Sequence, residues 1–151
     1  MNTYSIHLAE SESDIRRCHP VMVQLRPQLA ADEFVARVGR QRAEGYEVAY
    51  LESESQVRAV AGFRIVEMLM HGRHLYVDDL VTDAAQRSKG HGEVLMDWLV
   101  ERASAAGCKS LQLDSGVQRF EAHRFYFREG MYISSYHFSI KLEGCVCTVR
   151  G

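Results

Sequence analysis

The sequence lacks the features that would assign the chain to a membrane, repeat or low-complexity class. It contains no apolar run of about eighteen residues, the length that a helix needs to cross a bilayer. No apolar segment follows a basic N-terminal start, as a secretory signal would require. Internal repeats are absent as well. These absences predict a cytoplasmic globular protein without a membrane partner.

Cysteines are few and form no recognisable framework. The chain has four, Cys18, Cys108, Cys145 and Cys147, which are too scattered for a disulfide pattern. Cys145 and Cys147 form a Cys-x-Cys pair, but the second pair of ligands that a structural metal site needs is missing. We therefore expect neither a disulfide scaffold nor a metal.

An excess of charge of one sign is also missing. The net charge is −2, so the sequence does not predict the basic stripe of a nucleic-acid-binding protein. Apolar residues make up 46% and charged residues 25% of the chain, which is ordinary for a folded soluble protein. A length of 151 residues suits one domain, and we predict a single domain over residues 1–151.

Hydrophobic periodicity and capping signals predict alternating strands and helices. The predicted strands are Tyr4–Leu8, Tyr46–Leu51, Val57–Leu69, His74–Thr82, Ser110–Asp114, Met131–Ser134 and Tyr136–Leu142. The first predicted helix follows the capping residues Ser11–Asp14. Three more helices are predicted, from about Asp32 to Ala43, from about His91 to Gly107, and from about Arg119 to Glu129. Pro20 is expected to kink or divide the first helix. In the third, an apolar stripe that includes Trp98 and Val100 is expected to face the core.

The connections between these elements indicate the fold class. The polar loop Glu52–Gln56 and the turn Met70–Arg73 are short enough to join three strands into an antiparallel meander. The strand Ser110–Asp114 follows a helix, so we expect it to lie parallel to the strand before it, through a right-handed crossover. The prediction is an α/β fold of mixed α+β type, with a mostly antiparallel sheet, one parallel strand pair and helices on both faces.

The stretch from Leu80 to Leu99 is the main candidate for a ligand site. An apolar strand is followed by a polar turn with Arg87 and Lys89, and then by Gly90 and Gly92 at the start of a helix. Backbone N–H groups in such a turn lie at the positive end of the helix dipole and favour phosphate. A Gly-x-Gly before a helix is also explained by a tight connection without a ligand.

Two other phosphate-binding patterns fit less well. A dinucleotide fingerprint needs a third glycine where Leu95 stands, and its first glycine directly after the strand. Six polar or small residues, 83–88, intervene here. The P-loop needs a Lys-Ser or Lys-Thr pair after a glycine at fixed spacing, which the chain does not contain. A pyrophosphate-bearing cofactor such as coenzyme A therefore remains the better alternative.

Two segments resemble signatures of the GNAT superfamily of acetyl-CoA-dependent N-acetyltransferases. Residues 87–92, Arg-Ser-Lys-Gly-His-Gly, resemble its Arg/Gln-x-x-Gly-x-Gly/Ala loop, and residues 80–83 resemble the strand that leads into it. Residues 122–131, Ala-His-Arg-Phe-Tyr-Phe-Arg-Glu-Gly-Met, resemble its Ala-x-x-Phe-Tyr-x-x-x-Gly-Phe segment. The two segments occur in the family's order, and so do the elements of the N-terminal half. The resemblance implies a GNAT-like domain with a splayed parallel strand pair.

The same resemblance implies where acetyl-CoA binds. The backbone of Leu80, Val81 and Thr82 is expected to pair with the pantetheine arm between the splayed strands, and the amides of residues 87–92 to hold the pyrophosphate. Arg119 stands where the family often has Asn, so one cofactor contact is altered. The implied cofactor residues are Leu80, Val81, Thr82, Arg87, Ser88, Lys89, Gly90, His91, Gly92, Arg119, Ala122 and Tyr126.

The candidate catalytic residues are Tyr126, Asp79 and Asp78. An alkylamine must lose a proton before it attacks a thioester, and a carboxylate near the end of the strand is a candidate base. Because neighbours in a strand point to opposite faces, at most one of Asp78 and Asp79 is expected to face the site. Tyr126 matches the family tyrosine that protonates the departing thiolate, with packing among aromatic residues as the alternative. His91 and His123 are expected on solvated helix faces.

These residues support more than one function. The first hypothesis is direct acetyl transfer from acetyl-CoA to a primary amine of a small molecule or peptide, and Asp78, Asp79, Asp114 and Glu121 favour a cationic acceptor. A non-catalytic acyl-CoA-binding or regulatory module is the alternative, and a nicotinamide or flavin oxidoreductase is a third. The terminal strands and the tail 145–149 suggest a possible homodimer.

Overall fold

The structure is a computed structural model that describes residues 3–142. The chain divides into two compact units, Met1–Leu113 and Asp114–Gly151. The organisation of residues 1–151 as one domain stays a prediction.

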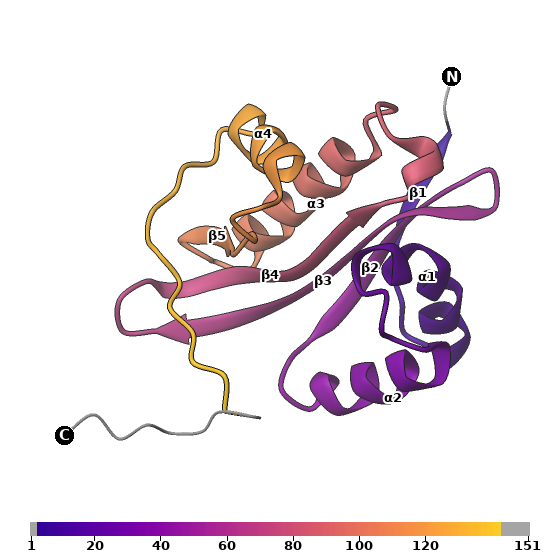
Figure 1. Cartoon of the computed structure of the whole chain (residues 1–151), viewed down its shortest axis with the longest axis horizontal. Coiled ribbons are helices and arrows are strands. Elements are labelled where there is room, and N and C mark those ends of the chain that lie inside the picture. The colour runs from indigo at the N-terminus through magenta and orange to yellow at the C-terminus, as the bar shows by residue number, and fades with distance from the viewer. Residues whose placement is uncertain (1–2, 143–151) are drawn as a thin grey trace. The chain divides into compact units, whose positions relative to one another are not determined.

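The first unit contains nearly all of the regular structure (Figure 1). Its strands are β1 (Tyr4–Leu8), β2 (Glu47–Ser53), β3 (Gln56–Met68), β4 (Gly72–Thr82) and β5 (Ser110–Leu113). Its helices are α1 (Glu12–Leu25), α2 (Ala31–Arg42), the short 3-10 helix η1 (Ala84–Gln86) and α3 (His91–Ala105). The strands form one sheet in the order β1-β2-β3-β4-β5.

Strand directions confirm the predicted mixed sheet. Neighbouring strands from β1 to β4 are antiparallel, whereas β5 lies parallel to β4. Since α3 connects β4 to β5, the parallel pair arises from a helical crossover, as the length of that connection predicts.

Helices cover both faces of this sheet, because successive strand residues alternate between two cores. Val48 and Tyr50 of β2 belong to a core that contains residues of α1 and α2, which we call the α1/α2 core. Ala49 and Leu51 belong to a second core with Leu95 and other residues of α3, the α3 core. The predicted placement of helices on both faces is confirmed for these helices.

The apolar stripe of α3 is nearly as predicted. Trp98 packs partly buried against the α3 core, with its ring edge-on to Phe63 at a centroid distance of 6.0 Å. Val100 is half exposed, so its inclusion in the stripe was wrong. It lies two positions after Trp98, which on a helix is about 200° around the axis.

Helix α1 starts at the predicted cap and continues through its proline. The Ser11 hydroxyl accepts from the Asp14 N–H, and the Asp14 carboxylate accepts from the Ser11 N–H, which forms a capping box. Pro20 lies inside the helix without dividing it. Ile15, Cys18, Val21 and Met22 bury one face across the proline, and this packing offsets the backbone hydrogen bond that proline cannot make.

The second unit contains one described helix, α4 (Phe120–Arg128). The strands predicted at Met131–Ser134 and Tyr136–Leu142 are wrong for this structure, because residues 131–142 contain neither helix nor strand. Their apolar side chains, including Tyr136 and Phe138, are exposed. An alternating pattern forms a strand only where a neighbouring strand accepts its backbone hydrogen bonds, and this unit has no described strand to do so.

Residues 3–142 contain neither a membrane-spanning helix nor a cluster of metal ligands. None of the described helices has both the length and the apolar composition that crossing a bilayer requires. In the same residues, no cluster of three or more His, Cys, Asp or Glu side chains is arranged to hold a metal ion. Cys145, Cys147 and the 145–149 tail lie outside the described residues.

Candidate active site

A β-bulge at Asp78 shapes the centre of the site. In the β3–β4 ladder Gly62 pairs with Asp79 and Phe63 pairs with Val77, so Asp78 is an extra residue on β4. A bulge interrupts the alternation of side chains, and both Asp78 and Asp79 line the cavity beneath α1 and α2. The opposite faces that regular strand alternation predicts for these two neighbours are therefore not found here.

Beyond the bulge, β4 loses its neighbour on one side. The parallel pairing with β5 runs only from His74 opposite Ser110 to Val77 opposite Leu113. β4 continues to Thr82 and stays paired with β3 on its other side. Within the first unit, the β4 edge from Asp78 to Thr82 is therefore open to another extended chain.

The cavity on the α1/α2 face has a volume of about 370 Å³, which is at the small end of the range for ligand sites. Both aspartates lie on one wall, and polar and charged side chains of α2 and of the loop after α1 lie on the others. The lining residues are Met22, Arg26, Gln28, Leu29, Phe34, Arg37, Val38, Gln41, Tyr46, Tyr76, Asp78 and Asp79.

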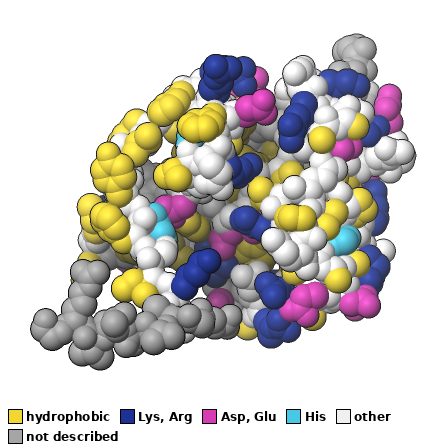
Figure 2. All heavy atoms as spheres, viewed as in Figure 1, with side chains coloured by type: hydrophobic (Ala, Val, Ile, Leu, Met, Phe, Trp, Pro, Cys, Tyr) yellow, Lys and Arg dark blue, Asp and Glu magenta, His cyan; other side chains and the backbone are white. Residues whose placement is uncertain are grey.

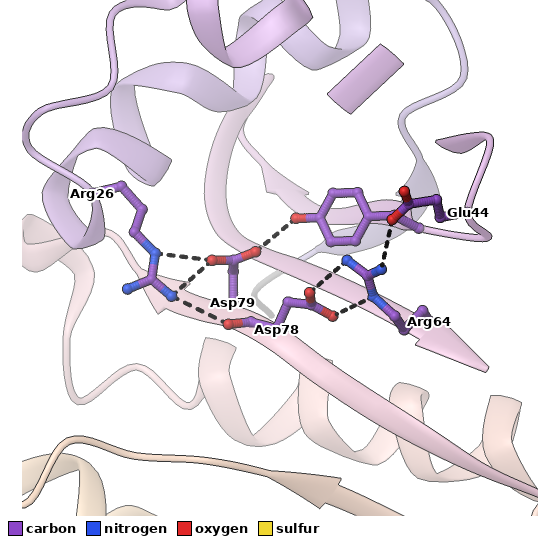
Figure 3. A network of polar contacts seen from close by, with 6 residues as sticks. Arg26, Glu44, Arg64, Asp78 and Asp79 are labelled. Atoms are coloured by element: carbon purple, nitrogen blue, oxygen red, sulfur yellow. Dashed lines mark hydrogen bonds and ion pairs between the residues drawn. The ribbon is translucent and has the colours of Figure 1, made fainter. Parts of the chain in front are cut away.

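Asp79 is held by two partners (Figure 3). The Tyr46 hydroxyl donates a 2.7 Å hydrogen bond to its Oδ2, and Arg26 Nε donates a 3.0 Å bond to its Oδ1. Tyr46 is 2% exposed, whereas the Arg26 side chain is about half exposed, because Arg26 caps the end of α1. One partner of Asp79 is therefore fixed in the core, and the other stands at the surface.

Asp78 is held differently, by a two-bond contact with Arg64 (Figure 3). Arg64 Nε donates to Oδ1 at 3.0 Å and Nη2 donates to Oδ2 at 2.7 Å. Both side chains are about four-fifths buried, which makes this planar pair a strong contact. The main-chain oxygen of Asp78 also accepts from Arg26 Nη2 at 3.2 Å.

Gly62 makes room for the Tyr46–Asp79 contact. A Cβ at position 62 would lie 1.8 Å from the Tyr46 hydroxyl oxygen and 2.8 Å from Asp79 Oδ2. Burial, and then the negative charge of Asp79, raise the pKa of Tyr46. Tyr46 is therefore a neutral hydrogen-bond donor throughout the physiological range.

The segment between β4 and α3 is anchored at its start. The Asp83 carboxylate accepts from the Ala85 N–H, and the Gln24 side chain of α1 binds both Asp83 and the Ala84 N–H. Ser88 and Gly90 then adopt left-handed backbone conformations, with φ of 67° and 79°. Gly90 precedes α3 and has no side chain to cap it, so the N-cap residue leaves the first N–H groups of the helix available.

His91, the first residue of α3, is buried rather than solvated, which corrects the prediction. It is 6% exposed, and within residues 3–142 its Nδ1 has no hydrogen-bond partner. Burial, and then the charges of Arg58 and Lys89, lower its pKa. A buried ring nitrogen without a partner and two nearby cations fit an anion at the start of α3.

The remaining predicted residues lie on β4 and α4. Leu80 packs toward the α3 core and Val81 toward the α1/α2 core, so normal alternation resumes after the bulge. In the second unit Arg119 is the N-cap of α4. Ala122 and Tyr126 lie one turn apart on the same side of this helix.

Two α4 side chains have defined surroundings. Burial raises the pKa of Tyr126, and the nearby positive charge of Arg119 opposes this effect. The Tyr126 ring also packs at an angle against the Phe125 ring, at 5.6 Å between centroids. His123 Nε2 donates to the Gly116 carbonyl at 2.8 Å, so this histidine is anchored rather than simply solvated.

Sequence reasoning missed the partners of the two aspartates. Tyr46 is 33 residues and Arg26 is 53 residues from Asp79 along the chain. Neither belongs to a motif or a periodic pattern that indicates this contact. Arg64 of β3 lies opposite Tyr76 of β4, and both strands were predicted. Only a prediction of the register between these two strands could have placed Arg64 near Asp78.

Several known proteins are similar to this chain. The "uncharacterized N-acetyltransferase YhdJ" of Bacillus subtilis is 35% identical over 137 residues, which cover 88% of this chain and 96% of that protein. The "aminoalkylphosphonate N-acetyltransferase" of Salmonella typhimurium is 32% identical over 84 residues, about half of each chain. A solved aminoglycoside N-acetyltransferase in complex with CoA superimposes with a TM-score of 0.82, covering 95% of this chain and 97% of that one. At 12% identity this last likeness shows the fold alone.

A family profile extends across both signature segments. The profile of the acetyltransferase (GNAT) family matches residues 8–131, from the end of β1 to the residue that follows Gly130. Together with the mixed sheet and the relative from Bacillus subtilis, this match identifies the family. The chain belongs to the acetyltransferase (GNAT) family.

Proposed function

We propose that this protein transfers an acetyl group from acetyl-CoA directly to a primary amine of a small molecule or peptide. The observation that carries the proposal is the shape of β4. It leaves its parallel partner after Val77, bulges at Asp78, and presents two carboxylates to a cavity beside an open strand edge. Membership of an acetyltransferase family supports the reaction class.

In this proposal, acetyl-CoA binds along the open edge of β4 and at the start of α3. The main chain of Leu80, Val81 and Thr82 pairs with the amides of the pantetheine arm, as an added strand would. The backbone N–H groups of residues 87–92 hold the pyrophosphate. Three features support this assignment: Gly90 supplies no side-chain cap to α3, the Nδ1 of His91 has no partner among the described residues 3–142, and the charge of Lys89 lies nearby.

The reaction needs a proton acceptor on one side and a proton donor on the other. The acceptor ammonium gives up a proton, and the amine nitrogen attacks the thioester carbonyl carbon. Its C–N bond forms as the C–S bond breaks, and the nitrogen releases a second proton. The departing thiolate takes up one proton, so one proton is released to solvent in each turnover.

Asp79 is the better candidate for the residue that receives the proton, directly or through a water molecule. Both oxygens of Asp78 are bound by the largely buried Arg64. The Arg26 contact of Asp79 involves a half-exposed side chain, which can move away as an acceptor enters. Asp78 then holds Arg64 and the bulge in place, and Asp79 faces the reacting amine.

Tyr126 is proposed to donate a proton to the thiolate. The family signature around it and its raised pKa support this role, because the phenol stays protonated at neutral pH. Arg119 and Ala122, at the N-cap and on the same face of α4 as Tyr126, complete the cofactor residues proposed from the family resemblance.

An amine-panel assay tests the proposal. The wild-type chain is incubated with acetyl-CoA and single amines, and thiol release is followed together with the mass of the acetylated product. We expect thiol release that requires the amine and matches the acetylated product in amount. Thermal stabilisation by acetyl-CoA without thiol release for any amine would instead support the alternative, a non-catalytic acyl-CoA-binding module.

A further inference from the structure

The cavity on the α1/α2 face is lined by charges of both signs. Four charged residues contribute to its lining, the carboxylates of Asp78 and Asp79 and the guanidinium groups of Arg26 and Arg37, so their formal charges cancel. Charges of both signs are also interspersed over the surface of α1 and α2 (Figure 2). A ligand that matches this lining carries both charges itself.

The guanidinium group of Arg37 has terminal nitrogens available for a ligand. Its Nε donates to Glu33 Oε1 at 2.7 Å from the next turn of α2. Within residues 3–142, no acceptor takes a hydrogen bond from its two terminal nitrogens. These nitrogens form the planar fork that binds a carboxylate or phosphonate through two bonds.

Two amide side chains also belong to the lining of this cavity. Gln41 follows Arg37 by four residues, one turn further along α2, and Gln28 lies in the loop that leads into α2. Neither side-chain amide has a hydrogen-bond partner in the described part of the chain. They are additional donors for an anionic group bound at Arg37.

We infer that the acetyl acceptor is a small amine that also carries an acidic group, with its ammonium toward Asp79 and its carboxylate or phosphonate at Arg37. This inference rests on the proposed acetyltransferase function. It departs from the cationic acceptor predicted from the sequence, where Arg26 and Arg37 were not known to share the cavity with the aspartates. Diamines and aminoglycosides would bring a second positive group against these arginines.

The test compares acceptors that differ only in the group at the far end. They are a linear ω-amino acid, the ω-aminoalkylphosphonate of the same chain length, the n-alkylamine and the α,ω-diamine, each with two to four carbons. For the wild-type chain we expect kcat/KM for at least one acid-bearing amine to exceed that for the alkylamine and the diamine by at least tenfold. Comparison of the ω-amino acid with the ω-aminoalkylphosphonate shows which acidic group is preferred.

Arg37→Gln tests the residue, and Arg40→Gln is its matched control. Both arginines lie on α2, are mostly exposed and pair with Glu33, but only Arg37 lines the cavity. We expect Arg37→Gln to raise KM for the acid-bearing amine at least tenfold. The kcat/KM for the alkylamine and the KM for acetyl-CoA should stay nearly unchanged. Arg40→Gln should retain the wild-type preference, and both variants should melt like the wild type.

The possible failures can be told apart. The inference is overturned if the wild type acetylates the alkylamine or the diamine with an equal or higher kcat/KM. It is also overturned if Arg37→Gln retains the preference for the acid-bearing amine. Either result leaves the proposed acetyl transfer intact. If no amine is acetylated, the proposed function fails. The inference about the acceptor then fails with it, and calorimetric binding of the ω-amino acid to the wild type and to Arg37→Gln tests only the ligand site, which should bind it at least tenfold more weakly without Arg37.

Discussion

The hydroxyl of Tyr46 donates a 2.7 Å hydrogen bond to Oδ2 of Asp79, joining the residue before β2 to the residue that follows the β4 bulge. The bond crosses directly over Gly62 of β3, where a side chain would occupy the same space. Because Tyr46 is buried and remains neutral, the contact fixes one oxygen of the carboxylate and leaves the other facing Arg26. The central strand therefore positions a carboxylate that lies on its neighbour.

Gly62→Ala should disrupt this contact. The added Cβ would lie 1.8 Å from the Tyr46 hydroxyl oxygen and 2.5 Å from Cζ, so the ring must move. Overpacking of this kind costs about 1–3 kcal/mol in the free energy of unfolding. We expect a lower melting temperature and a lower kcat, measured by calorimetry and by the acetylation assay.

Gly39→Ala is the control for that change. Gly39 lies in α2, and a Cβ there would meet nothing within 4 Å. Alanine should stabilise this helix by up to about 1 kcal/mol without changing kcat. If Gly62→Ala melted and turned over like Gly39→Ala, the Tyr46–Asp79 contact would have no importance for the site.

Asp79→Asn and Asp78→Asn should separate catalysis from stability. Loss of a general base lowers kcat by about 10²–10⁴-fold, and we expect this for Asp79→Asn. Asp78→Asn should instead mainly lower the melting temperature, because it removes the charge that pairs with the largely buried Arg64. Steady-state kinetics and thermal melts of both variants measure the difference, and a larger loss of kcat in Asp78→Asn would reverse the assignment.

Tyr126→Phe should lower kcat at least tenfold and leave the melting temperature unchanged, because only the donating hydroxyl is removed. Burial raises the pKa of Tyr126, so the phenol remains protonated up to at least its ordinary value of 10. No alkaline loss of wild-type activity below pH 10 should therefore arise from this residue. Tyr132→Phe, at an exposed position of the same unit, should be silent, and unchanged turnover in Tyr126→Phe would remove the residue from the mechanism.

His91 should make stability depend on pH. Burial holds its pKa below the ordinary 6.5, so between these values the unfolded chain binds more protons than the folded one. Stability from this group is therefore complete above pH 6.5 and is lost as the pH falls from there through the lowered pKa. His91→Gln should reduce the drop in melting temperature between pH 8 and pH 5.5.

The comparison at pH 8 is the internal control for that experiment. His91 is neutral in both states there, so a difference between His91→Gln and the wild type reports packing alone. If the difference in melting temperature between His91→Gln and the wild type were the same at pH 5.5 as at pH 8, His91 would not titrate as described.

The sheet and the loop before α3 were predictable because their signals are local. Alternation, turns and caps indicated β1 to β5, and the helix between β4 and β5 indicated their parallel pairing. The strands at 131–142 were predicted on the same signal and are absent, because alternation does not supply a partner strand.

The arrangement of the site was less predictable. The bulge at Asp78 depends on the register of β4 against Gly62 of β3, which no single segment encodes. The contacts of Asp79 with Tyr46 and Arg26 join residues that are distant in sequence. The aspartates could therefore be found as candidates, but their shared face and their arginine partners could not.

The most direct test of the central claim is a calorimetric titration of acetyl-CoA into the wild-type chain and into the double variant Arg87→Ala/Lys89→Ala. We predict one site per chain in the wild type, and an affinity at least tenfold weaker in the variant. Acetylpantetheine, which lacks the pyrophosphate, should bind both proteins equally. No binding of acetyl-CoA by the wild type, or equal affinity in the two proteins, would contradict the proposed site at the start of α3.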